Sequence, residues 1–399
     1  MSTPMPETGN NPQKDTTTAV ATKPGRGGLE GMAVGTTTLS KVEEKAGQLL
    51  YRGHNIHDLV GTKTFEEIAH LLWFGHLPSQ PELSHLKTQL VAERTMPGPI
   101  VQLLLNLPST IEPMDALRAA VSLWGAITIK GKPTLEQAIG VTARFPLFLA
   151  AFHRLRHGLE PLESRSELGH AANYLYLLTG QVPNDEQVKQ LDAYLVLLAE
   201  HGITASTFTA RVVASTESDL VSAVVAALGA LKGPLDGGAP SKVQDMLEAI
   251  GTAEHAEDWL RSALAKGERV MGFGHRIYET EDPRSEALRE MARIANPQEV
   301  ALASGVEEVA LPLLEQQRPG RHLHTNVAFY SATLLAAVGL PADLFTPTFA
   351  VGRVVGWTAH ILEQVGNNRV LQITWVTQFD PTHRHARAGW HESIEPSQS

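Results

Sequence analysis

The chain has 399 residues, of which 43% are hydrophobic and 19% are charged, so it is long enough and apolar enough to bury a large core. Its formal net charge of −10 argues against a nucleic-acid-binding or anionic-membrane-binding surface over the whole protein. Because the chain contains no cysteine, disulfides, iron–sulfur clusters, thiolate zinc sites and a cysteine nucleophile are excluded.

The first 28 residues are rich in threonine, proline, glycine, asparagine and lysine. This composition predicts a disordered tail at 1–28 rather than a signal peptide. Apolar runs such as Ala223–Leu228 are much shorter than the roughly 18 residues that a membrane span requires. We therefore expect a cytoplasmic protein with no membrane contact.

Helical periodicity dominates from about residue 64, where Thr64 is a candidate N-cap for a helix over 65–72. Breaks containing proline and glycine separate further expected helices at 114–127, 134–156, 168–179, 185–201, 206–231, 240–250, 255–266, 285–295, 305–316, 326–338 and 348–364. Strand signals are limited to a possible hairpin of 36–40 with 48–53 and to 369–375. A total of about eleven or twelve helices predicts an all-α fold.

Eight short motifs follow one another along the chain, at 28–31, 50–56, 113–118, 205–208, 233–239, 271–278, 282–284 and 356–360. In their order and spacing they resemble the citrate synthase family, in its short bacterial and archaeal type. The resemblance implies a large helical domain of 29–235 and 345–390 and a smaller mobile domain of 236–344 that closes over the active site. It also implies a homodimer.

The resemblance further implies an acyl-CoA cosubstrate, with no permanently bound cofactor and no metal. Citrate synthases take a proton from the methyl group of an acyl-CoA, add the resulting enol to the ketone of a 2-oxo acid, and hydrolyse the thioester. This chemistry needs a carboxylate base, a neutral donor to the enol oxygen and cations that hold the oxo acid.

Part of the family pattern is present. His275 matches the histidine that polarises the ketone, and Arg284 matches the arginine that holds a carboxylate as a bidentate pair. His201 matches a further substrate histidine. The loop that packs against the adenine of the acyl-CoA corresponds to 270–274, so Val270, Gly272 and Gly274 are candidate cosubstrate ligands. Arg276, which follows the loop, is a candidate ligand of the cosubstrate's phosphates. Three more cations are candidates for the phosphates: Lys266, Arg318 and Arg321.

The departures from the pattern concern the groups that perform the chemistry. Asp236 stands where the family has the enol-stabilising histidine, and Ala328 stands where it has the aspartate base. Gln372 replaces a second arginine for the oxo acid. Leu198 and Thr204 replace a histidine and an asparagine. An alanine cannot accept a proton, so efficient citrate synthesis is not expected.

Three interpretations follow. In the first, Asp236 takes over the acid–base role beside His275, and apolar replacements accommodate a partner less polar than oxaloacetate. In the second, no base is needed, because a malonyl-type thioester is decarboxylated or because a carbon–carbon bond is cleaved. In the third, the protein is an inactive ligand-binding or regulatory partner of an active paralogue.

Two other groups of residues remain to be considered. His322 and His324, two residues apart, are interpreted as part of a solvated loop rather than as metal ligands. In relatives, an arginine near the C-terminus reaches into the neighbouring subunit's site. Arg384 or Arg387 is a candidate for that role, and a solvated tail is the alternative.

Overall fold

The computed structural model describes residues 34–274, 278, 280–320 and 323–371. The described residues from Thr37 onward form one compact unit, and the described residues 34–36 do not belong to it. The predicted tail at 1–28 lies outside the described residues.

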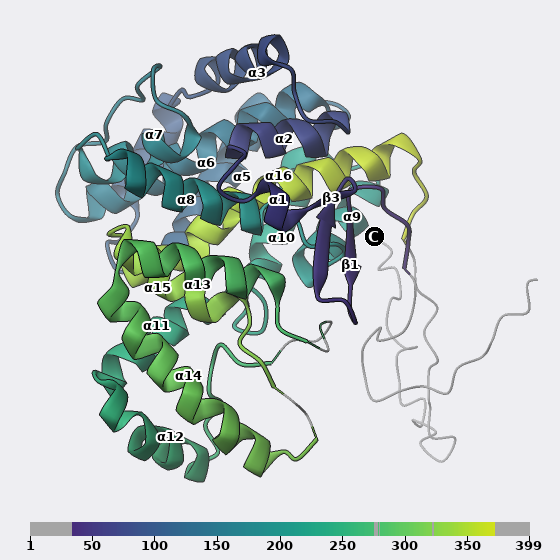
Figure 1. Ribbon diagram of the computed structural model, residues 1–399. Helices are drawn as coiled ribbons and strands as arrows, with labels where there is room; N and C mark the ends of the chain where they lie inside the picture. Colours follow the sequence, from purple (N-terminus) through teal and green to yellow (C-terminus); the bar gives the residue numbers. More distant parts are fainter. Residues whose placement is uncertain (1–33, 275–277, 279, 321–322, 372–399) are drawn as a thin grey trace, which may run out of the picture. The chain divides into compact units, whose positions relative to one another are not determined.

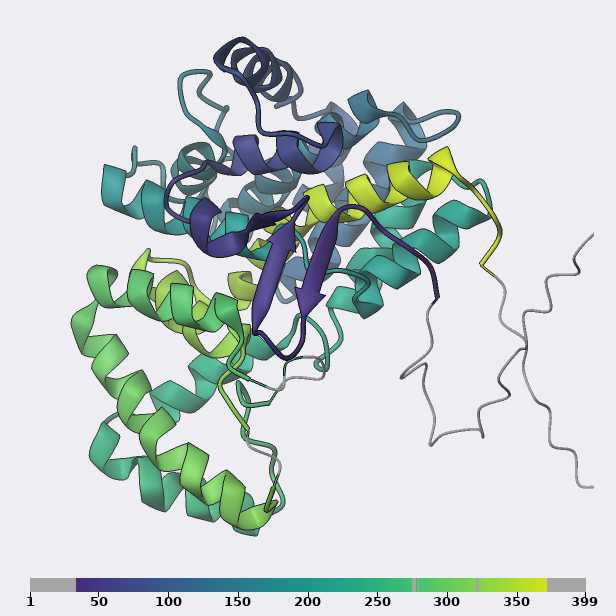
Figure 2. The same cartoon turned by 45° about the vertical axis from the view of Figure 1, so that its right-hand side comes forward.

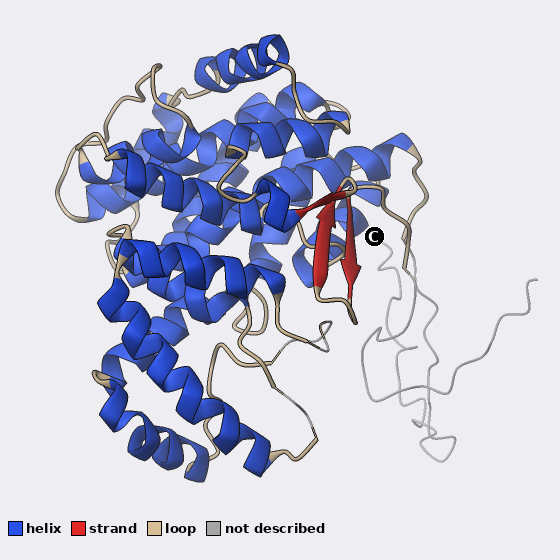
Figure 3. Ribbon diagram, in the orientation of Figure 1, coloured by secondary structure: helices blue, strands red, loops and turns tan. Residues whose placement is uncertain are grey.

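A small antiparallel sheet precedes the helices (Figure 3, red). It consists of β1 (Ser40–Glu43), β2 (Gln48–Tyr51) and β3 (His54–Asn55), in the order β1-β2-β3. Ser40 pairs with Tyr51 and Glu43 with Gln48. The predicted hairpin is confirmed, although its first strand begins at Ser40 rather than at residue 36. The sequence also predicts a strand at 369–375. Residues 369–371 are not in a strand, and residues 372–375 lie outside the described residues.

Helices make up most of the described chain, which confirms the all-α prediction (Figure 3). Their bounds are α1 (Ile56–Leu59), α2 (Phe65–Phe74), α3 (Gln80–Ala92), α4 (Gly98–Asn106), α5 (Pro113–Thr128), α6 (Leu135–Arg156), α7 (His170–Thr179), α8 (Asp185–Leu198), α9 (Ala205–Ser215), α10 (Leu220–Leu231), α11 (Ala239–Ile250), α12 (Ala256–Ala265), α13 (Pro283–Ala295), α14 (Pro297–Gln317), α15 (Val327–Ala337) and α16 (Phe345–Gly366). Two short 3₁₀ turns are η1 (Ala253–His255) and η2 (Ala342–Leu344). No helix in the described ranges is long and apolar enough to cross a membrane.

Local sequence explains where several helices begin. Thr64 caps α2 as predicted, and its side chain and that of Glu67 form a reciprocal capping box. Helices α3 and α4, which the sequence analysis did not list, carry a proline in the first turn, where its missing N–H costs nothing. The expected helix 206–231 is two helices, because Asp219 caps a new one at Leu220.

Helix α16, yellow in Figures 1 and 2, is buried around almost its whole circumference. It packs against α2, α6, α8, α9 and α10. A helix without a solvent-facing stripe belongs in the middle of a core. The buried polar side chains of α16, such as Arg353 and His360, are therefore held in an environment of low dielectric constant.

Helices α11, α13, α14 and α15 pack against one another, and α12 packs against α14 (Figure 1, green). All of them fall within 236–344. The division of the chain into a large and a small domain at these positions stays a prediction.

Candidate active site

The candidate site is built around Arg353, a charged residue in the apolar stretch of α16. Its side chain is only 1% exposed. Nε donates a hydrogen bond of 2.6 Å to the carbonyl oxygen of Leu198, and the guanidinium lies 4.9 Å from the ring centroid of Phe349. Nη2 is buried and has no hydrogen-bond partner among the described residues. A buried, unpaired N–H of a cation is costly, so it marks a position where an anion is stabilised.

Two glycines of α16 allow the end of α8 to approach Arg353. A Cβ atom at Gly352 would lie 3.1 Å from the carbonyl oxygen of Leu195, and one at Gly356 would lie 2.2 Å from that of Ala199. Only glycine fits such a close helix contact. The contact sets the segment Leu198–His201 beside Arg353.

A buried polar network fixes the same segment. Glu200 and His360 are both 0% exposed, and His360 Nε2 lies 2.9 Å from Glu200 Oε1. Arg211 Nη1 donates to His360 Nδ1 at 3.0 Å, so His360 carries its proton on Nε2 and donates it to the carboxylate. Burial alone would raise the pKa of Glu200, but its interactions with His360, Arg353 and Ser40 together outweigh burial, and the pKa is lowered. Glu200 therefore remains an anion close to Arg353.

Asp236 lies in the loop between α10 and α11. Burial raises the pKa of its carboxyl group, while the charge of Arg353 and contacts with Ser206 act in the opposite direction. Oδ2 is buried and has no hydrogen-bond partner among the described residues. An unpartnered carboxylate oxygen with a raised pKa has the properties of a proton acceptor or donor.

His201 follows Glu200 and is 3% exposed. Its Nε2 lies 3.1 Å from the hydroxyl group of Tyr278, and the two rings meet edge to face. Burial raises the pKa of Tyr278, so this hydroxyl group stays protonated at neutral pH. The structure thus connects the α8–α9 segment to the loop that precedes α13.

Arg284 is 3% exposed and forms an ion pair with Asp282. Its Nε and Nη2 donate to the two oxygens of Asp282 at 3.0 and 2.8 Å. The backbone N–H of Val327, at the start of α15, donates to the same carboxylate at 3.2 Å. The resemblance predicts that Arg284 holds a substrate carboxylate as a bidentate pair. In the structure, Nε and Nη2 of Arg284 are instead paired with the carboxylate of Asp282, and Nη1 lies on the side of the guanidinium away from this pair.

Ala328 follows Val327 in the first turn of α15 and is 4% exposed. Its methyl group offers no acceptor. The position at which the family resemblance expects the base is thus apolar and buried in this chain.

The glycine-rich loop at 270–274 is held by main-chain pairing. Gly274 N donates to the carbonyl oxygen of His324 at 2.7 Å, and Asn326 N donates to that of Gly272 at 2.9 Å. Gly272 and Gly274 have φ angles of +86° and +83°, which favour glycine. A Cβ atom at Gly272 would also lie 2.8 Å from Phe329. Packing thus explains these glycines without any ligand, and Val270, 5% exposed, belongs to the core. Contact with an acyl-CoA stays a prediction.

Several expected site residues lie outside the described residues: His275, Arg276, Arg321, His322, Gln372, Arg384 and Arg387. Of the residues that are described, Glu200, Arg284 and Asp236 each lie close enough for their charge to act on Arg353. The sequence analysis missed Arg353. The available signal was a single arginine in the otherwise apolar stretch 349–357.

The arrangement can bind an anion and transfer a proton. Two buried guanidinium groups, Arg353 and Arg284, lie close enough for the charge of Arg284 to lower the pKa of Arg353. Such a pair attracts a carboxylate. Asp236, close to Arg353, supplies a carboxyl group for acid–base chemistry.

Comparison with known proteins gives one consistent result. The family model described as "Citrate synthase, C-terminal domain" matches residues 28–374. A citrate synthase 2 from Bacillus subtilis (strain 168) is 42% identical over 352 residues, which cover 86% of this chain and 93% of that protein. A 2-methylcitrate synthase from Mycobacterium tuberculosis (strain ATCC 25618 / H37Rv) is 38% identical over 350 residues, covering 86% and 88%.

Solved structures of citrate synthases also match the chain. The crystal structure of a citrate synthase from Thermotoga maritima MSB8 matches with a TM-score of 0.79 and 36% identity, and the match covers 90% of this chain and 99% of that one. A citrate synthase from Thermoplasma acidophilum, in a ternary complex with carboxymethyl coenzyme A and oxaloacetate, matches with a TM-score of 0.84 and 26% identity over 90% and 97% of the two chains.

Proposed function

Because the chain belongs to the citrate synthase family, we propose that it is an enzyme that forms or cleaves a carbon–carbon bond between an acyl-CoA and a carbonyl partner such as a 2-oxo acid. Its substrate or mechanism differs from that of ordinary citrate synthesis. The observation that carries this proposal is Asp236, whose unpartnered Oδ2 is buried close to Arg353.

Asp236 acts as the acid–base residue. In the forming direction, a carboxylate oxygen of Asp236 takes a proton from the carbon next to the thioester carbonyl, and the C–H electron pair passes into the enolate. The enolate carbon then bonds to the carbonyl carbon of the partner, the C=O π electron pair passes to the partner's oxygen, and that oxygen takes up a proton from water. The raised pKa of Asp236 suits this step near neutral pH. His275, matched by resemblance, would polarise the partner's carbonyl group.

Arg353 and Arg284 select a partner that carries a carboxylate. Among the described residues, Nη2 of Arg353 has no hydrogen-bond partner, and Nη1 of Arg284 lies opposite its pairing with Asp282. Leu198 and Ala328 are apolar where the family resemblance expects polar groups. This combination favours a 2-oxo acid with fewer polar groups than oxaloacetate.

The remaining expectations rest on family membership. The acyl-CoA is a cosubstrate and not a resident cofactor, the loop 270–274 is its proposed adenine contact, and Arg276 is a proposed contact of its phosphates. The proposed assembly is a cytoplasmic homodimer, in which Arg384 or Arg387 of one subunit completes the other's site. The proposed closure of 236–344 over the substrates brings Asp236 against the ligands bound to Arg353.

A panel of substrates tests the proposal. The purified protein is mixed with acetyl-, propionyl- or malonyl-CoA and a series of 2-oxo acids that includes oxaloacetate, and products are followed by mass spectrometry and by thiol release. We expect a product from a pair other than acetyl-CoA and oxaloacetate, and we expect Asp236→Asn to abolish it. The matched control is Asp245→Asn, which alters an exposed aspartate of α11.

Two results would contradict the proposal. Rapid citrate formation from acetyl-CoA and oxaloacetate would mean that the substitutions at 236 and 328 do not alter the reaction. Tight binding of acyl-CoA and 2-oxo acids with no product, together with complex formation with an active paralogue, would instead assign a regulatory role, which the buried Ala328 also fits.

A further inference from the structure

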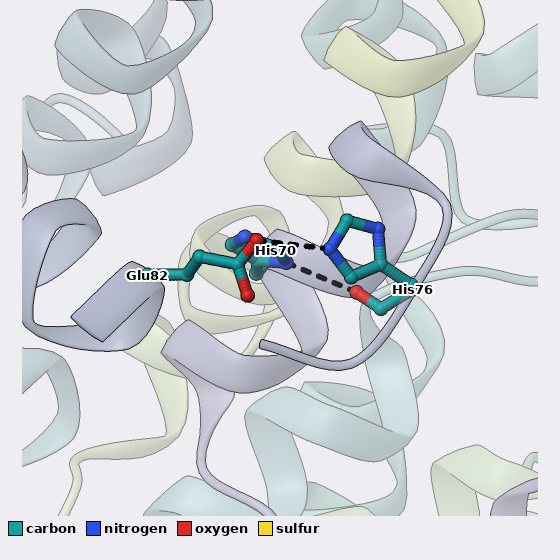
Figure 4. A group of neighbouring side chains, drawn as sticks. All are labelled: His70, His76 and Glu82. Atoms are coloured by element: carbon teal, nitrogen blue, oxygen red, sulfur yellow. Dashed lines mark hydrogen bonds and ion pairs between the residues drawn. The ribbon is translucent and has the colours of Figure 1, made fainter. Parts of the chain in front are cut away.

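A cluster of two histidines and one glutamate lies at the corner between α2 and α3, among residues not assigned to the candidate active site (Figure 4). His70 comes from α2, His76 from the loop that follows, and Glu82 from the first turn of α3. One ring nitrogen of each histidine and one oxygen of the glutamate all lie within 4.8 Å of one another. The three side chains thus converge from three consecutive segments.

Further contacts orient the side chains of His70 and Glu82. The ring of His70 stacks on Phe74 with centroids 4.3 Å apart, and its Nδ1 lies 3.0 Å from the carbonyl oxygen of His76. Oε2 of Glu82 accepts hydrogen bonds from the backbone and hydroxyl group of Ser79, at 2.7 and 2.6 Å. These contacts leave Oε1 of Glu82 facing His76 Nε2 at 3.2 Å. Ligands oriented by neighbouring hydrogen bonds are typical of metal sites.

The spacing and exposure of these side chains also fit a small metal ion. Two ligands of a tetrahedral zinc ion, each about 2.0–2.1 Å from the metal, are about 3.3 Å apart. The contact of His76 with Glu82 already has this separation. The side chains of His76 and Glu82 are 56% and 45% exposed, so an ion can enter and the two can move toward the buried His70.

We propose that His70, His76 and Glu82 form a binding site for a divalent transition metal such as zinc, with water as the fourth ligand. Two imidazoles and one carboxylate are a ligand set that zinc accepts and that magnesium and calcium disfavour, because those ions prefer oxygen ligands only. The ion would cross-link the end of α2 to the start of α3.

Metal titration of the whole protein tests the site. The protein is treated with a chelator, dialysed, and titrated with Zn²⁺ by calorimetry and with Co²⁺ by visible absorption. The chain has 17 histidines, so binding elsewhere is separated by comparing variants. We expect His76→Ala and Glu82→Gln to bind one equivalent fewer, or to weaken one site at least tenfold, with loss of the Co²⁺ absorption of that site. Mg²⁺ should not compete.

The variants are chosen so that a loss of metal binding cannot be attributed to a folding defect. His76 is in an exposed loop, and a glutamine at position 82 retains the side-chain oxygen that caps α3. His85→Ala, an exposed histidine of the same helix, is the matched control and should bind as the unaltered protein does. If His76→Ala and Glu82→Gln keep the full stoichiometry and affinity, or if the unaltered protein binds no Zn²⁺, the proposed site is wrong.

Discussion

Arg353 Nε donates a 2.6 Å hydrogen bond to the carbonyl oxygen of Leu198, across 155 residues of sequence. The bond ties a buried cation of α16 to the segment that carries Glu200 and His201. At Leu198 the family resemblance expects a histidine, so the carbonyl oxygen that accepts from Arg353 belongs to a residue whose side chain is apolar in this protein. The proposed preference for a less polar carboxylate partner follows from this combination.

Replacing Arg353 by methionine should weaken binding of the carboxylate partner by about ten- to a hundredfold, because a charge-assisted hydrogen bond contributes about 1.5–3 kcal/mol. Arg353→Lys should give an intermediate affinity, since it keeps the charge and loses the planar fork. Calorimetric titration with the 2-oxo acids of the substrate panel measures both, and circular dichroism verifies folding. An unchanged Kd in Arg353→Met would show that Arg353 does not bind the carboxylate partner.

A second prediction concerns Asp192 of α8, whose Oδ1 accepts a hydrogen bond from the backbone N–H of Phe65 at 3.1 Å. Burial, reinforced by the charge of Glu66, raises the pKa of Asp192 to about 8. The unfolded chain loses this proton near pH 4, so between about pH 4 and 8 the folded state binds more protons than the unfolded state. The contribution of Asp192 to stability should therefore fall as the pH rises through this window, by up to about 1.4 kcal/mol per pH unit.

Asp192→Asn keeps an acceptor for Phe65 and removes the titration. Urea unfolding of both proteins at pH 5, 6.5 and 8 measures the difference. We expect the variant to gain stability relative to the unaltered protein at each step to higher pH. A difference that is constant over this range would show that Asp192 has an ordinary pKa.

A third prediction tests the helix contact that positions the site. Gly356→Ala places a methyl group 2.2 Å from the carbonyl oxygen of Ala199 and 2.5 Å from Oε2 of Glu200. Overpacking of this kind costs about 1–3 kcal/mol, and a clash with backbone favours the upper end. The displaced α8 end should also weaken ligand binding. Gly366→Ala, at the end of the same helix and with nothing within 4 Å of its Cβ position, should be neutral or slightly stabilising in thermal melts. Equal melting temperatures for the two variants would contradict the contact.

The sequence predicts local features of the fold well. Thr64 caps α2 because its hydroxyl group and Glu67 lie three residues apart, and the β1–β2 hairpin follows from adjacent strands. Helices α3 and α4 are not among the predicted helices, although each carries a proline in the first turn, a common start signal, and α3 has a capping box of Ser79 and Glu82. Local patterns thus predict many helices and miss others that carry the same signals.

The candidate site is harder to predict because its contacts join distant segments. The apolar stretch around Arg353 indicates that the residue is buried, but it does not indicate that its Nε donates to the carbonyl oxygen of Leu198. Motif spacing locates Arg284, but not the pairing of its Nε and Nη2 with Asp282. The apolar replacements in the site predict a raised pKa for Asp236, but the proximity of Asp236 to Arg353 depends on the fold.

The central claim is that Asp236 transfers the proton at the carbon next to the thioester. The most direct measurement is the exchange of that proton for deuterium when the protein is incubated in D₂O with the acyl-CoA and the 2-oxo acid selected by the substrate panel. We predict exchange by the unaltered protein and by Asp245→Asn, and a loss of at least about a hundredfold in Asp236→Asn, as expected when an acid–base residue is removed. Exchange at an unchanged rate in Asp236→Asn would contradict the account.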